Sequence, residues 1–162
     1  MPETTSIKEI LDTYGKYSGL TTGTSMLPLL HQGKDTIIVI KPKERLKKYD
    51  VALYVTPQGK YIMHRVIEVY DDHYIITGDN LLAKEYVTDD MICGKLAGFY
   101  KNGKHFVDCD NSKGYKLYSK IWVALRPLRP ALLFCRRASR FIRVFPYRVH
   151  GKLKKFSRRT NK

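Results

Sequence analysis

The chain has 162 residues and a mass of 18.8 kDa, and its 43% hydrophobic and 12% aromatic content is enough for a buried core, which argues against global disorder. Its net charge is +15, but residues 1–100 hold 12 Lys and Arg against 13 Asp and Glu, whereas residues 101–162 hold 18 against 2. No apolar run exceeds five residues, whereas a transmembrane helix needs about twenty and a signal-peptide core about seven. We therefore expect a protein that is cytoplasmic or peripheral to a membrane.

The first hundred residues predict a helix followed by strands. Ser6-Ile7-Lys8-Glu9 has the form of a capping box and predicts a short helix over 6–15. Beyond it, β-branched and aromatic runs predict strands at 35–40, 50–55, 61–70, 73–77, 91–100 and 104–107. Many short strands without interleaved helices are typical of a mainly β, antiparallel domain. We expect this domain over residues 20–110, after a helix and lead-in over 1–19.

Residues 111–162 predict a basic, partly helical extension. A helix is expected over 117–125, before Pro127 and Pro130. Between Pro130 and Pro146, Arg residues lie on one face of the expected helix. On another face, apolar residues recur at helical spacing, at Phe134, Ala138, Phe141, Ile142 and Phe145. This pattern favours contact of 117–162 with an anionic membrane surface. Two alternatives stay open: a helix packed on its own domain, and the less favoured binding of nucleic acid.

Cysteine and histidine spacings predict neither a disulfide framework nor a metal site. The three Cys form no CxxC pair, and the five His show no HxxxH or HExxH spacing. No Walker loop or dinucleotide fingerprint is present either, so we expect no cofactor. Cys109 lies between Asp108 and Asp110, whose charges oppose formation of a nucleophilic thiolate.

Three polar stretches interrupt the apolar context. The first is Gly23-Thr24-Ser25-Met26-Leu27-Pro28, where glycine and proline favour a turn that exposes a hydroxyl. The second is His64, which strand alternation places on one face with Ile62 and Val66. The third is Gly78-Asp79-Asn80. Taken singly, these stretches are better explained by an ordinary turn, a core histidine and a second turn than by a functional site.

Taken in order, the three stretches resemble a known superfamily. Ser25-Met26-x-Pro28, Asp50-Val51, His64-Arg65-Val66-Ile67 and Gly78-Asp79-Asn80 are similar to the motifs of the type I signal peptidases, whose superfamily includes the LexA-like self-cleaving repressors. The resemblance covers roughly residues 20–100. His64 stands where the bacterial housekeeping enzymes have Lys. A His at this position resembles the Ser-His branch, which is found in the endoplasmic reticulum, in archaea and in SipW-type enzymes.

The resemblance implies a serine endopeptidase with an antiparallel β catalytic domain that binds an extended peptide or preprotein segment. Ser25 would be the nucleophile and His64 its base, a role that suits imidazole because its pKa is near neutrality. Asp79 is the first candidate to orient His64, Glu85 is the second, and Asp89 and Asp90 rank lower. Backbone N–H groups over 23–25 would hold the oxyanion. The remaining expected binding residues are Gly23, Thr24, Met26, Tyr61 and Ile62.

The sequence also departs from the family pattern. The family normally has an N-terminal transmembrane anchor and Thr-Leu after the motif proline, where this chain has Leu29-Leu30. Two other functions are therefore kept as alternatives: a LexA-like regulator that binds nucleic acid, and a catalytically idle module on a membrane surface.

Overall fold

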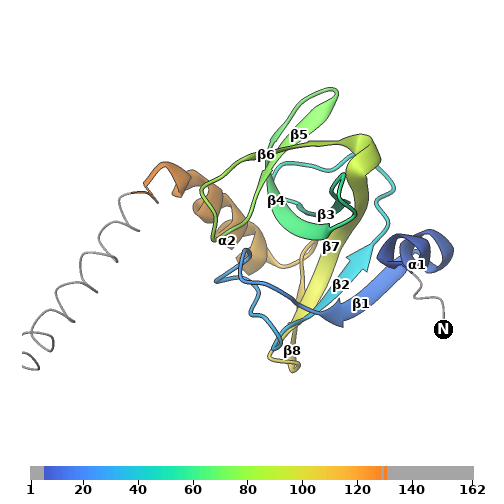
Figure 1. Cartoon of the computed structure of the whole chain (residues 1–162). Helices are drawn as coiled ribbons and strands as arrows, with labels where there is room; N and C mark the ends of the chain where they lie inside the picture. The colour runs from blue at the N-terminus through green and yellow to red at the C-terminus, as the bar shows by residue number, and fades with distance from the viewer. Residues whose placement is uncertain (1–5, 129, 131–162) are drawn as a thin grey trace, which may run out of the picture. The chain divides into compact units, whose positions relative to one another are not determined.

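The computed structural model describes residues 6–128 and 130 (Figure 1). One compact unit extends to Ala124, and a second unit starts at Leu125. The described elements are α1 (Ile7–Tyr14), β1 (Lys16–Leu20), β2 (Thr36–Ile40), β3 (Val51–Val55), β4 (Tyr61–Val69), β5 (His73–Thr77), β6 (Glu85–Thr88), β7 (Ile92–Lys101), β8 (His105–Asp108) and α2 (Lys113–Ala124), with short 3₁₀ helices at Asp89–Met91 and Arg126–Leu128.

The strands of the described chain form one antiparallel sheet. Its order is β1-β2-β7-β3-β4-β5-β6, and β8 pairs with β7. In Figure 1, β1, β2 and β8 lie in the lower half of the domain and β4–β6 in the upper half. The predicted fold class, mainly antiparallel β with a short N-terminal helix, is confirmed.

Local sequence signals account for α1. Ser6 Oγ accepts the Glu9 N–H at 3.2 Å, and Glu9 Oε2 accepts the Ser6 N–H at 2.9 Å, so the predicted capping box is present. The helix ends at Gly15, whose φ of +69° is the left-handed conformation that glycine adopts without strain. The chain then turns directly into β1, a strand that the sequence patterns did not predict.

Strand β3 divides the core into two clusters because both of its faces are buried. Val51 and Leu53 face a cluster that also contains Leu11 of α1, whereas Ala52 and Tyr54 face a second cluster. Side chains of a strand alternate between faces, so consecutive residues along β3, and likewise along β4, have side chains on opposite faces of the sheet. This separation positions the candidate site.

Helix α2 belongs to the same compact unit as the sheet. The sequence placed a C-terminal extension from residue 111 and a helix over 117–125. Instead, the helix starts at Lys113, after Ser112 Oγ accepts the Tyr115 N–H at 3.2 Å, and Tyr115 and Ser119 are buried against the sheet domain. The unit therefore ends at Ala124. The predicted apolar stripe between Pro130 and Pro146, and the rest of the predicted extension up to residue 162, lie outside the described residues.

Candidate active site

Ser25 lies in the loop between β1 and β2, and the loop is anchored in the core. Met26, Leu29 and Leu30 are buried in the first cluster, while Ser25 itself is half-buried. Gly23 has a φ of +79°, where any residue with a Cβ is strained. The apolar anchors hold the backbone in place and leave Ser25 partly accessible.

The Gly78-Asp79-Asn80 turn packs against this loop and donates hydrogen bonds to its backbone. The Asn80 backbone N–H donates to the Ser25 carbonyl oxygen at 2.7 Å, and Asn80 Nδ2 donates to the Thr24 carbonyl oxygen at 3.2 Å. A Cβ on Gly78 would lie 2.7 Å from the Ser25 carbonyl oxygen, so the two backbones approach this closely because residue 78 has no side chain.

His64 and Arg65 are neighbours on β4 that point to opposite faces of the sheet. His64 is only 3% exposed and lies on the side of Val66 and the second cluster, as the alternation predicted. Arg65 is 1% exposed and reaches α2, where Nη1 donates to Ser119 Oγ at 2.8 Å. One strand thus supplies a buried base to one face and a buried cation to the other.

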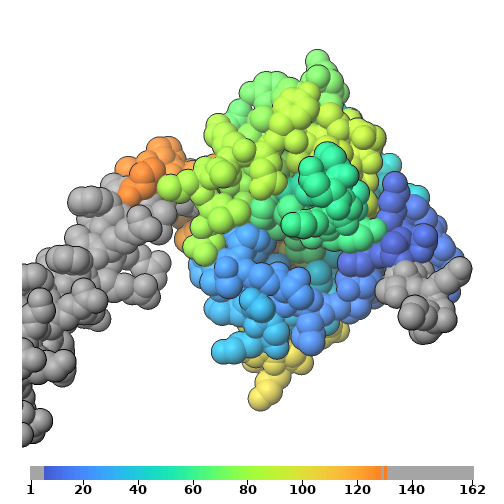
Figure 2. Space-filling model, viewed as in Figure 1, coloured from blue at the N-terminus to red at the C-terminus, as the bar shows by residue number. Residues whose placement is uncertain are grey.

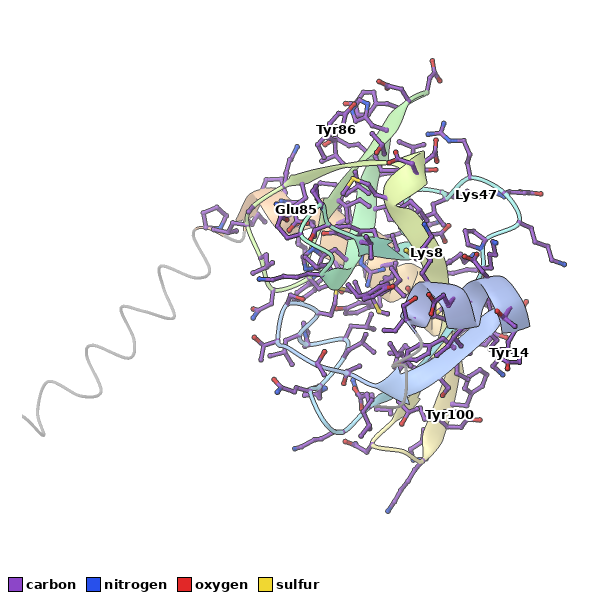
Figure 3. The ribbon with its side chains drawn as sticks, turned by 45° about the vertical axis from the view of Figure 1, so that its right-hand side comes forward. Lys8, Tyr14, Lys47, Glu85, Tyr86 and Tyr100 are labelled. Atoms are coloured by element: carbon purple, nitrogen blue, oxygen red, sulfur yellow. The ribbon has the colours of Figure 1, made fainter. Side chains whose placement is uncertain are left out.

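The His64 ring is held through one nitrogen. Its Nδ1 lies 3.3 Å from Glu85 Oε1 and 3.2 Å from the Tyr54 hydroxyl. That hydroxyl also donates to Glu85 Oε2. Glu85 is at the start of β6, near the body of the domain, whereas Tyr86 lies farther toward the tip of the β4–β5 hairpin (Figure 3). Nδ1 is therefore occupied, and Nε2 is the nitrogen left for chemistry.

The surroundings of His64 favour its neutral form. Burial lowers its pKa below the ordinary value of 6.5, and the nearby Glu85 carboxylate opposes this shift without cancelling it. At neutral pH the imidazole is thus unprotonated at one nitrogen and ready to accept a proton. A buried histidine without a carboxylate at Nδ1 would lack a group to stabilise the imidazolium once it forms.

Asp79 forms a buried ion pair with Arg65. Arg65 Nε donates to Asp79 Oδ1 at 2.8 Å and Nη2 donates to Oδ2 at 2.7 Å, a bidentate arrangement in which both side chains are about 1% exposed. Burial alone would lower the pKa of Arg65, but Asp79 outweighs it and the pKa is raised. The Tyr49 carbonyl and the hydroxyls of Tyr115 and Ser119 accept further bonds from Arg65.

The structure therefore separates the two first-ranked carboxylates. Sequence reasoning put Asp79 first as the residue that orients His64, but both Asp79 oxygens accept from Arg65 on the opposite face of β4. Glu85, the second candidate, lies against His64 Nδ1. Of the lower-ranked candidates, Asp89 pairs with Arg45 at 3.0 Å and Asp90 is exposed.

Ser25 and His64 line the same cavity, which has a volume of about 480 Å³. Its lining includes four of the expected binding residues, Gly23, Met26, Tyr61 and Ile62. Figure 2 shows this face as a hollow between the blue surface of the β1–β2 loop and the green surface of the β3–β4 hairpin. Among described residues, no hydrogen bond joins Ser25 and His64 directly; such bonds are often long before substrate binds.

Sequence reasoning missed several residues of this site. Ile7 of α1 and Tyr17 of β1 also line the cavity, and Tyr54 joins His64 to Glu85. Tyr54 lies in the strand predicted over 50–55, but only the register of β3 against β4 shows that it reaches His64. Thr24, which was expected in the binding set, instead supplies the carbonyl that accepts from Asn80.

Cys109 remains a poor nucleophile for a different principal reason. Burial, rather than the charges of Asp108 and Asp110, is the main cause that raises its pKa to about 12. Within residues 6–128 and 130, no group of three or more His, Cys, Asp or Glu side chains is arranged to hold a metal ion.

In the part of the chain that the structure describes, no helix combines the length and apolar content that crossing a membrane requires. Neither the models of known protein families nor the curated proteins give a match to this chain.

Proposed function

We propose that this chain is a serine endopeptidase of the signal peptidase type. The observation that carries the proposal is that Ser25 and a buried His64 line one cavity while a carboxylate, Glu85, lies 3.3 Å from the other side of the imidazole. A nucleophile, a base and a group that orients the base form the arrangement used in triads on unrelated folds. The order of the sequence motifs supports the same assignment.

In the proposed mechanism, His64 Nε2 takes the proton of the Ser25 hydroxyl as Oγ bonds to the carbonyl carbon of the scissile peptide. Backbone N–H groups over 23–25 stabilise the oxyanion that forms. The carbon–nitrogen bond then breaks, and His64 returns the proton to the leaving amine. Water, activated by the same imidazole, hydrolyses the acyl-enzyme. Glu85 stabilises the imidazolium during both steps.

The proposed substrate is an extended peptide or preprotein segment. Met26, Tyr61 and Ile62 give the cavity apolar walls, which suit the side chains of a peptide whose backbone pairs with a strand edge. Asp79 has a positioning role in this proposal. Its pair with Arg65 holds the turn whose Asn80 binds the backbone of Ser25.

The test is cleavage of a panel of peptides with small residues before the expected bond, followed by mass spectrometry. Ser25→Ala should reduce cleavage at least about a thousandfold. Ser18→Ala, at an exposed serine of β1, is the matched control and should cleave like the wild type. The same cut made at an undiminished rate by purified Ser25→Ala protein would sink the proposal.

We further propose that the domain is peripheral to an anionic membrane through α2. Its outer face presents exposed Lys113, Lys116 and Lys120 beside Leu117 and Ile121, which are 59% and 48% exposed. No Asp or Glu follows Asp110 in the sequence. Cations beside exposed apolar side chains match the charge and depth profile of an anionic leaflet.

A further inference from the structure

Tyr54 is a buried residue whose hydroxyl has two partners in the candidate site. It lies on β3, is 1% exposed and packs in the apolar second cluster. A phenol buried among apolar side chains requires a hydrogen-bond partner. Here the partners are Glu85 Oε2 and His64 Nδ1, so the hydroxyl joins the base to its carboxylate.

The positions of the protons follow from what each group can donate. A phenol has one hydrogen, and an ionised carboxylate only accepts. Because Tyr54 donates to Glu85, the side of its oxygen that faces His64 presents a lone pair, 3.2 Å from Nδ1. Glu85 Oε1, at 3.3 Å from Nδ1, is also an acceptor. Two acceptors at one ring nitrogen require that nitrogen to carry the hydrogen.

We infer that Tyr54 is a positioning residue that, together with Glu85, holds His64 in the Nδ1–H tautomer and so leaves Nε2 free to accept the proton of Ser25. The inference rests on the proposed function for its catalytic meaning, although the tautomer itself is a property of the resting protein. The groups that act on His64 are Tyr54 from β3, Glu85 from β6 and the charge of Asp79 after β5.

The phenol keeps its hydrogen wherever the enzyme would work. Burial, reinforced by the bond to Glu85, raises the pKa of Tyr54 well above its ordinary value of 10.0. It therefore stays a donor to the carboxylate while His64 titrates. A tyrosine suits this position better than a second carboxylate, because it adds a hydrogen bond without adding charge to a buried site.

The experiment measures the tautomer directly. In wild-type protein labelled with ¹⁵N, long-range proton–nitrogen NMR spectra should show His64 with its hydrogen on Nδ1. Tyr54→Phe should increase the Nε2–H population, because Nδ1 then loses one of its two acceptors and Glu85 loses a donor that orients it. Kinetically, kcat should fall about ten- to hundredfold with little change in KM, the range for a lost hydrogen bond to a charged group.

Tyr74→Phe is the matched control. Tyr74 is equally buried, lies in the same cluster, and donates its hydroxyl to a carboxylate, that of Asp89. Its replacement should cost comparable stability but leave the His64 signals and kcat unchanged.

Two results would overturn the inference. One is a wild-type His64 that carries its hydrogen on Nε2, and this measurement does not depend on the folding of any variant. The other is a folded Tyr54→Phe protein with unaltered His64 signals. Neither depends on peptidase activity. A protein with the expected tautomer shift and no cleavage of any peptide would instead contradict the proposed function.

Discussion

The backbone N–H of Asn80 donates to the carbonyl oxygen of Ser25 at 2.7 Å, although the two residues are far apart in the sequence. The adjacent Asp79 forms the bidentate pair with Arg65, and Arg65 in turn donates to Ser119 of α2. These hydrogen bonds, together with the peptide link between Asp79 and Asn80, connect α2 to the backbone of the candidate nucleophile.

Gly78→Ala should displace the Ser25 loop. The new Cβ would meet the Ser25 carbonyl oxygen at 2.7 Å, so one of the two backbones must shift, and catalysis is sensitive to shifts of about 1 Å. We expect kcat/KM for peptide cleavage to fall about a hundredfold. Gly114→Ala is the control: its Cβ meets nothing closer than 3.9 Å, and alanine in helix α2 should stabilise the protein by about 0.5–1 kcal/mol. Equal activity in both variants would contradict the prediction.

Arg65→Met should strongly destabilise the domain. It leaves the Asp79 carboxylate buried without its cation, and breaking a buried pair in this way typically costs about 3–5 kcal/mol. Urea unfolding followed by fluorescence of Trp122 measures the change. Arg45→Met breaks an exposed pair with Asp89 and should shift the midpoint much less. Similar midpoints for the two variants would show that the buried pair does not stabilise the fold.

Glu85→Gln should lower kcat by about a hundredfold or more, because the imidazolium that forms during catalysis loses its counter-charge. It should also lower the pKa of His64 further, since the Glu85 carboxylate is the strongest of the nearby groups that raise it. NMR titration of the His64 ring protons measures that shift. Glu44→Gln, at an exposed loop position, should change neither quantity. An unchanged His64 titration in Glu85→Gln would remove Glu85 from the proposed triad.

Activity should fall on acidification with a midpoint below 6.5. Burial lowers the pKa of folded His64 from 6.5, so the neutral, basic form persists below the pH at which a free histidine is half protonated. Stability follows the same group. Between the folded pKa and 6.5 the unfolded chain binds more protons, so the free energy of unfolding decreases as pH falls through that window. A profile of kcat/KM against pH and urea unfolding at several pH values check both signs; an acidic limb above pH 6.5 would contradict the assignment.

Vesicle flotation tests the proposed membrane face of α2. The protein should float with vesicles that contain phosphatidylserine and not with neutral phosphatidylcholine vesicles. Charge reversal at Lys116 and Lys120 together should weaken binding at least about thirtyfold, because each cation near an anionic leaflet contributes about 1 kcal/mol. Reversal at Lys60 and Lys104, exposed in two hairpin turns, is the control. Tight, salt-sensitive binding to duplex DNA without vesicle binding would favour the nucleic-acid alternative.

Much of the fold was predictable because its signals are local. The capping box determined α1, and β-branched runs predicted β2, β3, β4 and β5 to within one residue at each end. The alternation of β4 also predicted that His64 shares a face with Val66, since the period of a strand depends on backbone geometry alone. In contrast, β1 and β6 were missed, because short strands with exposed positions lack a clear apolar pattern.

The sequence by itself identified Ser25 and His64 as candidates through the order of motifs, and it limited the supporting carboxylate to a few residues. It did not determine which carboxylate lies beside the imidazole. That choice depends on the pairing of β5 with β6, which carries Glu85 to the His64 face, and on the opposite face of β4, where Arg65 binds Asp79. Tyr54 entered the site in the same way, through the register of β3 against β4. Contacts between residues distant in the chain are set by strand register and by the pairing of buried charges, and only the tertiary structure specifies these.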